Sequence, residues 1–321
     1  MSRTVIIAPS ADIAKTIEAD VTVEAEYGSV VAKGSVYTAA HHQPGMEDLP
    51  APCVDENIPT LDEATVLVSH LDLDTIGGVL RVFGSPVMDK APSFWKLAAF
   101  VDKMGPHKLG ESGASETDIK RLYAFWAWMK ENVKHFSRDE ATIITGTILD
   151  CEAVINEIID GSTSLGTLSD KWIQPDLLRD GEIMRQEEMK LNRSTFITAS
   201  KIDNVIFRIT SFKEGDGQGF CNHLYNDPDG KTYAGVVAWD KFGGSITISL
   251  ADSIEGVSCR EIMQNLFGPE AGGHDNIAGS PREAKMTWAD AMRCVKMLEW
   301  AIYWKSDDPP PRGDHDHDLR A

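Results

Sequence analysis

The chain is poor in cysteine, and the cysteines that it has follow no structural pattern. Its five cysteines are scattered, and no two of them form a Cys-x-x-Cys pair: Cys53, Cys151, Cys221, Cys259 and Cys294. An odd and dispersed set argues against a disulfide framework and against structural zinc, and it is typical of proteins in a reducing compartment.

Long hydrophobic runs are also missing. No apolar stretch approaches the roughly 20 residues that a membrane-spanning helix needs, and the first residues lack the basic-then-apolar layout of a secretory signal. We therefore expect a cytoplasmic protein with no membrane partner. The sequence also has no Walker loop, no Gly-x-Gly-x-x-Gly after a strand and no Gly-x-Ser-x-Gly elbow, which leaves P-loop, dinucleotide-binding and serine-hydrolase chemistry unsupported.

Positive charge is in short supply. Against 50 Asp and Glu there are 31 Lys and Arg, so the net charge is −19. This charge argues against tight binding to long duplex DNA, which depends on many Lys and Arg contacts to phosphates. The negative charge is compatible with a small phosphorylated substrate or a short single-stranded oligonucleotide. Such a substrate would be held by a metal and a few cations.

The most informative stretch runs from Val66 to Arg81. An apolar run ending at Val68 predicts a buried strand, and His70, Asp72 and Asp74 follow at alternate positions before a Gly77-Gly78 pair that we expect to open a helix. Residues just past the carboxyl end of a strand in an open α/β sheet are where ligands bind. One imidazole and two carboxylates there suit a hard cation such as Mn²⁺ or Mg²⁺, whereas the alternative is a plain polar loop.

Two further clusters have the same character. His41-His42 follows a predicted strand that ends at Ala40. A predicted helix over residues 92–103 ends at Asp102-Lys103, and His107 follows it. Because parallel strands bring their carboxyl ends together, we expect these side chains to meet around one or two ions. The predicted metal ligands are His41, His70, Asp72, Asp74 and Asp102, and the predicted catalytic histidines are His42, His107 and His274. An incidental His-His pair and a simple helix end are the alternatives.

A glycine-rich stretch near the carboxyl end predicts a substrate-binding loop. Gly272 and Gly273 let backbone N–H groups approach an anion, His274 can donate to a phosphoryl oxygen, and Arg282 adds a cation. A plain turn is the other reading of the same residues.

The predicted fold is α/β, with a parallel-sheet N-terminal domain at residues 1–165 and a smaller α+β C-terminal domain at 193–305. A helical connector at 166–192 joins them, a disordered tail follows from 306 to 321, and the substrate is expected in the cleft between the domains. Two helices are predicted in the second half of the N-terminal domain. One covers residues 116–136, and the other starts at the Ser137-x-x-Glu140 capping pattern and stops at Gly161.

Several of these pieces together resemble the DHH phosphoesterase superfamily. Residues 69–78 resemble its first motif, His-x-Asp-x-Asp after a strand, and residues 267–279 resemble the Gly-Gly-His signature of its DHH-associated domain. Residues 38–42 resemble the name-giving Asp-His-His, and residues 98–102 the later motif whose Asp ligates metal. The resemblance implies a two-metal site, usually Mn²⁺, at a cleft between domains, and hydrolysis of phosphodiester or phosphoanhydride bonds.

The sequence departs from that family pattern in two ways. Ala40 stands where the family has the Asp of Asp-His-His, and His41-His42 precedes the first motif instead of following it. A circular permutation accounts for the order, and coincidence is the alternative.

The function expected from the sequence is that of a metal-dependent phosphohydrolase, in which nuclease activity on short substrates is included. Two other readings stay open, a metalloenzyme that acts on an amide or by deamination, and a non-catalytic nucleotide-binding protein. The oligomeric state is open as well, a homodimer included.

Overall fold

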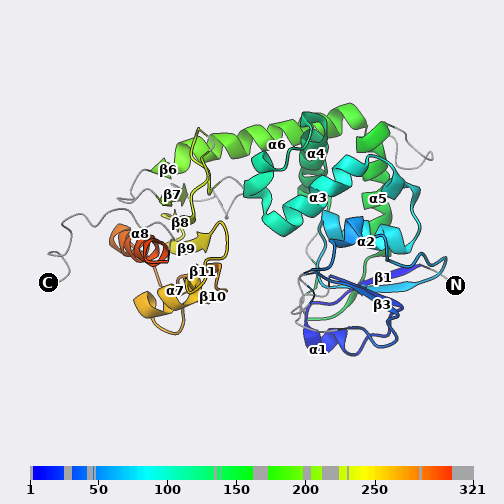
Figure 1. The fold of residues 1–321 in the computed structure, drawn as a ribbon, viewed down its shortest axis with the longest axis horizontal. Helices are drawn as coiled ribbons and strands as arrows, with labels where there is room; N and C mark the ends of the chain where they lie inside the picture. The colour runs from blue at the N-terminus through cyan, green and yellow to red at the C-terminus, as the bar shows by residue number, and fades with distance from the viewer. Residues whose placement is uncertain are drawn as a thin grey trace. The chain divides into compact units, whose positions relative to one another are not determined.

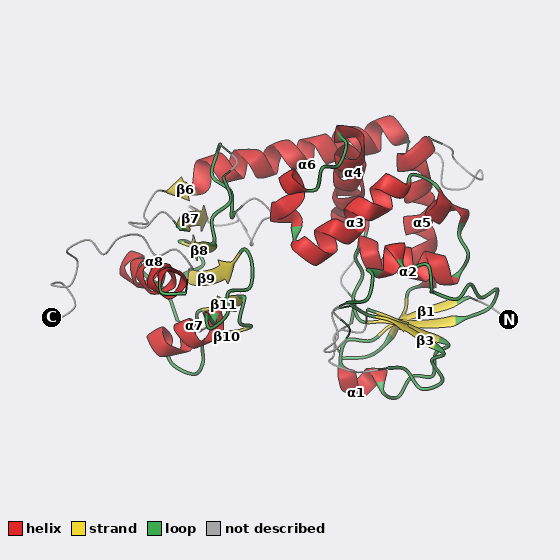
Figure 2. Cartoon of the chain, in the orientation of Figure 1, coloured by secondary structure: helices red, strands yellow, loops and turns green. Residues whose placement is uncertain are grey.

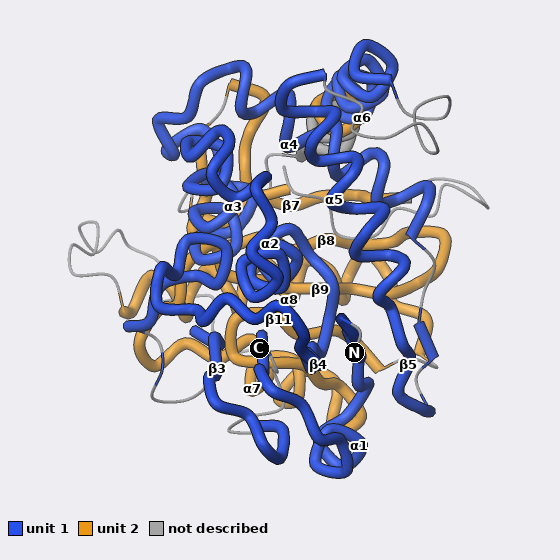
Figure 3. The backbone as a smooth tube through the Cα atoms, turned by 90° about the vertical axis from the view of Figure 1, so that its right-hand side faces the viewer, with its two compact units in different colours: residues 1–186 blue, residues 187–321 orange. Residues whose placement is uncertain are grey.

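The computed structural model describes most of the chain. The described residues are 3–24, 31–41, 46, 48–133, 136–137, 139–161, 173–197, 204–211, 224–229, 231–281 and 284–305, with backbone alone at 191–197 and 211. The predictions for His42, Arg282, the tail after residue 305 and the first part of the connector lie outside these residues. The chain divides into two compact units, residues 1–186 and residues 187–321 (Figure 3). No helix in the described ranges is long and apolar enough to cross a membrane.

The first unit is built on a five-stranded sheet with the order β3-β2-β4-β1-β5. Its strands are β1 (Thr4–Ile7), β2 (Val21–Val23), β3 (Tyr37–Ala39), β4 (Thr65–Val68) and β5 (Thr142–Ile143). The first four are parallel to their neighbours, and only β5, at one edge, runs antiparallel to β1. The predicted parallel α/β sheet is therefore present, with β4 at its centre.

Helices cover both faces of this sheet (Figure 1). They are α1 (Ala11–Ala14), α2 (Leu73–Val82), α3 (Pro92–Met104), α4 (Glu116–Asn132) and α5 (Thr145–Asp160), together with the 3₁₀ turns η1 (Pro52–Val54), η2 (Pro86–Asp89) and η3 (Pro106–Glu111). The short α1 lies on one face, and α2 to α5 lie on the other.

The alternation of side chains along β4 explains this layering. Val66 and Val68 belong to the large core under α2 to α5, whereas Leu67 between them belongs to the small cluster around α1. All three are fully buried. A strand that is covered on both faces reads as a continuous apolar run, which is why β4 stands out in the sequence.

The Gly77-Gly78 pair lies in the middle of α2, not at its opening as we had expected. A Cβ on Gly77 would come within 2.4 Å of the Cβ of Cys53, and one on Gly78 within 2.6 Å of the Cβ of Pro52. The pair is therefore required by the close packing of η1 against the helix, and the opening of α2 is provided instead by the side chain of Asp72, which caps it.

The region after α4 also differs from the sequence prediction. The helix ends at Asn132 instead of near Phe136, and the Ser137 hydroxyl accepts hydrogen bonds from the N–H groups of Asp139 and Glu140 without starting a helix. The next helix, α5, begins at Thr145 and ends at Asp160, and the left-handed φ of 65° at Gly161 makes that glycine the expected stop. The capping pattern is a local turn here because β5 intervenes.

The second unit contains a six-stranded sheet with the order β10-β11-β9-β8-β7-β6. Its strands are β6 (Phe196–Ile197), β7 (Val205–Ser211), β8 (Gly235–Asp240), β9 (Ser245–Leu250), β10 (Gly272–Gly273) and β11 (Ile277–Gly279), and its helices are α7 (Cys259–Phe267) and α8 (Trp288–Tyr303) (Figure 2). Only the β7–β8 pair is parallel. Helix α6 (Gln174–Thr195) runs across the boundary between the units.

The core of the second unit again follows the strand alternation. Phe207 and Val237 pack with α7 and α8, whereas Ile206 and Val236 face the cluster around Tyr225. This α+β arrangement agrees with the class that the sequence predicted for the C-terminal region.

Candidate metal centre

Three neighbouring strands of the first sheet end at the same edge, and polar side chains follow each of them. Glu24 comes directly after β2 and His41 shortly after β3, while Asp74 lies in the first turn of α2, which follows β4. Asp102 joins them from the last turn of α3. The parallel order β3-β2-β4 places these carboxyl ends side by side, so the fold itself gathers the four groups.

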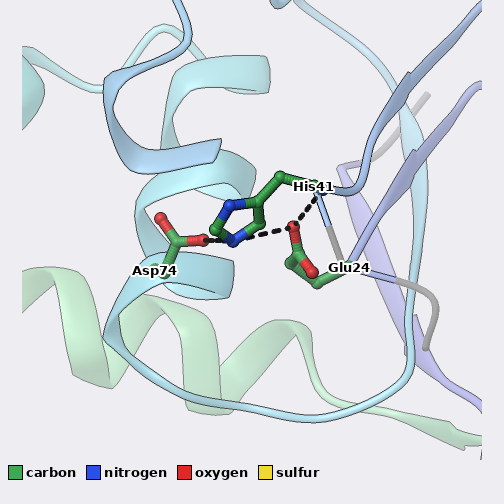
Figure 4. A group of neighbouring side chains, drawn as sticks. All are labelled: Glu24, His41 and Asp74. Carbon is green, nitrogen blue, oxygen red and sulfur yellow. Dashed lines mark hydrogen bonds and ion pairs between the residues drawn. The ribbon is translucent and has the colours of Figure 1, made fainter. Parts of the chain in front are cut away.

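The imidazole of His41 is the centre of this group (Figure 4). Its Nε2 lies 2.6 Å from Asp102 Oδ2, and 3.8 Å from both Glu24 Oε1 and Asp74 Oδ2. Glu24, His41 and Asp74 are all buried, and one ligand atom from each lies within 4.8 Å of the others. Three carboxylates thus converge on a single ring nitrogen. A cation that binds at this point would be shared by the imidazole and the carboxylates.

Glu24 is the member of this group that the sequence analysis missed. The alternation of residues 21–25 favours a strand that continues past it, but β2 ends at Val23 and Glu24 adopts a positive φ of 42°. This turn brings the carboxylate inward, where Oε1 accepts a hydrogen bond of 3.2 Å from the backbone N–H of His41. The available signal was the one used elsewhere, a polar residue directly after an apolar strand.

Asp74 is held from one side only. Its Oδ1 accepts a hydrogen bond of 2.9 Å from the backbone N–H of Cys53, whereas its Oδ2 is buried and accepts no hydrogen bond from any described residue. Burial, and then the neighbouring charge of Asp102, raise the pKa of Asp74 to about 6. A buried carboxylate oxygen without a hydrogen bond is costly, so this atom fits a cation well.

Cys53 lies beside the centre, and its thiol contacts a backbone carbonyl. Its Sγ lies 3.4 Å from the carbonyl oxygen of Trp95, in position to donate to it, and burial followed by the charge of Asp74 raises the pKa of the thiol well above its usual range. The donors that remain are three carboxylates and one imidazole, a set that suits Mn²⁺ or Mg²⁺ better than zinc.

A second pair of predicted ligands, His70 and Asp72, lies in the loop before α2. The Ser69 hydroxyl hydrogen-bonds to the backbone carbonyl of Glu24 and lies 2.9 Å from His70 Nδ1, so Nδ1 carries the hydrogen that Ser69 accepts. In the neutral ring, Nε2 then offers a lone pair. This lone pair lies 3.2 Å from both the hydroxyl of Thr75, which can donate to it, and Asp72 Oδ2. The imidazole and the carboxylate are thus both within reach of an ion in this loop, and their role as metal ligands stays a prediction.

The structure brings some predicted site residues together and leaves others undecided. His41, Asp74 and Asp102 meet as expected, and His70 and Asp72 contact each other. The ring of His107 lies over Gly105 at the start of η3, and its role in the centre stays a prediction. His42 is outside the described residues, so its predicted role also stays a prediction.

The glycine stretch of the second unit forms a tight hairpin between β10 and β11. The backbone N–H of His274 donates to the carbonyl of Ile277 at 2.7 Å, and Gly273 has a φ of 148° with its missing Cβ only 2.4 Å from that same oxygen. Gly273 is therefore required by the turn itself. His274 and Gly272 are exposed, and substrate binding by Gly272, Gly273, His274 and Arg282 stays a prediction.

Comparison with known proteins gives a distant likeness only. No protein-family model matches the chain, and no curated protein matches it. Among solved structures, a pGpG-specific phosphodiesterase, PggH, from Vibrio cholerae has a TM-score of 0.39 and 14% identity, over 78% of this chain and 83% of that one. An exopolyphosphatase-related protein from Bacteroides fragilis has a TM-score of 0.32 and 16% identity, over 88% of this chain and 71% of that one. At these scores the likeness carries no functional argument, and the assignment of function depends on the site.

Proposed function

We propose that the protein is a metal-dependent phosphohydrolase that cleaves a phosphodiester or phosphoanhydride bond in a nucleotide, a short oligonucleotide or a similar small phosphorylated substrate. The observation that carries the proposal is the convergence of three carboxylates on the Nε2 of His41 at the carboxyl edge of a parallel sheet. Several carboxylates are buried together at a cost unless they are paired or bind a metal.

The chain's own residues hold the ligands in place before any ion arrives. The backbone N–H groups of His41 and Cys53 fix one oxygen each of Glu24 and Asp74, and the Ser69 hydroxyl hydrogen-bonds to the carbonyl of Glu24. Ligands oriented in this way lose little freedom on binding, and such supporting contacts tune metal affinity.

Glu24, His41, Asp74 and Asp102 would hold one Mn²⁺ or Mg²⁺ ion, and His70 and Asp72 would contribute to a second. When bound, such an ion activates water and neutralises charge at a phosphoryl group. His42 or His107 is proposed to protonate the leaving oxygen as a general acid.

The donor set and the charge of the chain select the class of substrate. Hard oxygen ligands favour Mn²⁺ or Mg²⁺, the ions that bind phosphoryl oxygens, over the zinc that an amide hydrolase or a deaminase would use. The net charge of −19 repels long polyanions and disfavours long nucleic acid.

The test is an activity assay on the full chain loaded with Mn²⁺. Substrates are a 5′-phosphorylated dinucleotide, a cyclic dinucleotide, a short single-stranded oligonucleotide and pyrophosphate. We expect turnover of at least one of them, and a loss of more than about 100-fold in Asp74→Asn, since even an outer-shell partner of a metal ligand is worth 10–100-fold.

Asp55→Asn is the matched control for this substitution. Asp55 is equally buried but accepts a hydrogen bond of 2.6 Å from the hydroxyl of Tyr37 instead of facing His41. Folded, metal-loaded protein that turns over none of the substrates overturns the proposal. Elemental analysis separates the alternatives, because one tight zinc per chain favours amide or deamination chemistry, and nucleotide binding that survives Asp72→Ala and Asp74→Ala favours a non-catalytic protein.

A further inference from the structure

A cavity of about 590 Å³ opens within the first unit, beside the candidate metal centre. Its wall is made by the end of β1, the loop between β4 and α2, the last turn of α4 and the segment after that helix. The volume lies within the range of roughly 300–1,000 Å³ that small-molecule sites occupy. None of the functions assigned above uses most of this wall.

The wall is largely apolar. Five hydrophobic side chains contribute to it: Ile7, Leu71, Met129, Val133 and Phe136. All except Ile7 are partly exposed and pack against the core with their remaining surface. An apolar wall of this kind disfavours a chain of phosphates and favours a flat, uncharged ring. Phe136 offers an aromatic face, and Met129 a flexible and polarisable side chain that adapts to such a ring.

Among the described residues, the wall also carries a lysine beside the polar side chains of Ser69, His70 and Ser137. Lys130, in the last turn of α4, is exposed, and no carboxylate in the described ranges forms an ion pair with it. In a chain with a net charge of −19, an ammonium group without such a pair is available to an anionic ligand. Lysine binds phosphate as a point charge.

The cavity and the metal centre share residues. Ser69 and His70 both line the cavity, while the Ser69 hydroxyl hydrogen-bonds to the carbonyl of Glu24 and His70 Nε2 lies 3.2 Å from Asp72. A molecule in the cavity is therefore next to the ligands proposed for the metal ions.

From these observations we infer that the cavity binds the nucleobase of a nucleotide whose phosphate lies on the metal centre. Phe136 and Met129 contact the ring, and Lys130 contacts a phosphoryl oxygen of the same nucleotide. This inference rests on the proposed function and narrows it, because it makes a nucleotide, rather than pyrophosphate or polyphosphate, the preferred substrate.

The first experiment compares a 5′-phosphorylated dinucleotide with its abasic analogue, which keeps the phosphodiester and lacks the bases. We expect the wild-type protein to prefer the dinucleotide in kcat/KM by about tenfold or more, and Phe136→Ala to reduce that preference by about tenfold, since stacking of a base on an aromatic side chain contributes on that scale. Equal turnover of the two substrates by the wild-type protein overturns the inference and leaves the proposed function intact. If the protein turns over neither of these substrates nor any other phosphorylated substrate, both the inference and the proposed function are overturned.

The second experiment needs no turnover and does not depend on the folding of Phe136→Ala. Binding of a nucleoside monophosphate and of the corresponding nucleoside to the Mn²⁺-loaded protein is measured by calorimetry in the wild-type protein and in Lys130→Gln. We expect Lys130→Gln to weaken nucleotide binding several-fold and nucleoside binding little. Lys120→Gln is the matched control, because Lys120 is an exposed lysine of the same helix that does not line the cavity. Equal loss in both lysine variants, or none in either, contradicts the inference.

Discussion

At the scale of single residues, the folded structure disfavours the ionised form of the Asp74 side chain. Its side chain is buried, Asp102 lies nearby, and both effects raise its pKa to about 6. An acid whose pKa is higher in the folded state than in the unfolded state favours folding only while it is protonated. The metal-free protein therefore loses stability from this group as the pH rises from about 4 to about 6.

Replacing Asp74 by Asn should separate the stability of the chain from its affinity for metal. The Asn amide oxygen can still accept the hydrogen bond from Cys53 N–H and carries no charge. We expect the metal-free variant at pH 8 to be more stable than the wild-type protein, by at most about 3 kcal/mol for a pKa shift of this size. Urea unfolding in EDTA measures this, and a variant less stable than the wild-type protein would contradict the assignment.

The same raised pKa makes metal binding dependent on pH. An ion that binds Asp74 must displace its proton, so the dissociation constant for Mn²⁺ should rise by up to about tenfold per pH unit below pH 6. Calorimetric titration with MnCl₂ between pH 7.5 and pH 5 measures the dependence. An affinity that stays constant over this interval would mean that Asp74 is no ligand.

Sequence patterns identified most of these residues but not their exact partners. His41, Asp74 and Asp102 were predicted from their places after strands and in a helix, and they meet as expected. Glu24 was missed because the chain turns at a positive φ, a conformation that the alternation of β2 does not reveal. Contacts that depend on a single unusual backbone angle are not encoded in a periodic pattern.

At the scale of elements, the opening of α2 combines a structural and a chemical task. Asp72 caps the helix, with its Oδ1 accepting the N–H of Thr75 at 2.8 Å, while its Oδ2 faces His70. Asn is as good a cap as Asp, whereas Ala is not.

Two substitutions at Asp72 should therefore separate its role in capping α2 from its proposed role in the metal centre. We expect Asp72→Asn to keep the stability of the metal-free protein within about 0.5 kcal/mol and Asp72→Ala to lose about 1 kcal/mol. Both should lower Mn²⁺-dependent activity to a similar degree. Thermal unfolding and initial rates measure the two effects, and full activity in Asp72→Asn would exclude the carboxylate from the centre.

The middle of α2 is another place where an element supports the site. Gly77 allows η1 to approach, and η1 supplies the N–H of Cys53 to Asp74. We expect Gly77→Ala to destabilise the protein by about 1–3 kcal/mol through overpacking and to weaken Mn²⁺ binding. Gly146→Ala in α5, where a Cβ meets nothing within 4 Å, is the control and should stabilise by about 0.5–1 kcal/mol. Chemical denaturation compares the two, and equal effects would contradict this account of the packing.

The elements show where sequence periodicity is informative. The strands that end near Val68 and Ala40 and the helix α3 were predicted within a few residues, as was the end of α5, because apolar spacing and helix stops act locally. The end of α4 and the turn at Ser137 were wrong, because β5 pairs with β1, far away in the sequence, and takes up the residues that a capping pattern assigns to a helix.

At the scale of the whole molecule, charge should govern the choice of substrate. With a net charge of −19, the protein repels a polyanion in proportion to the length of that polyanion. We expect kcat/KM for an oligonucleotide of about 20 residues to rise when salt is increased from about 20 to about 200 mM, the opposite of a basic nucleic-acid-binding protein. A dinucleotide should respond less. Rates at fixed Mn²⁺ measure this, and a fall with salt for the longer substrate would indicate a basic binding track.

The meeting of three parallel strand ends has a consequence for how such proteins are recognised. The neighbours in this sheet are fixed by pairing, not by the sequence in which the chain visits them, so β4 lies at the centre although it comes fourth among the strands. A centre assembled in this way tolerates reshuffling of its motifs along the polypeptide. Relatives of this chain should accordingly be sought by the strand that each ligand follows, because a search that demands one linear succession of motifs passes them by.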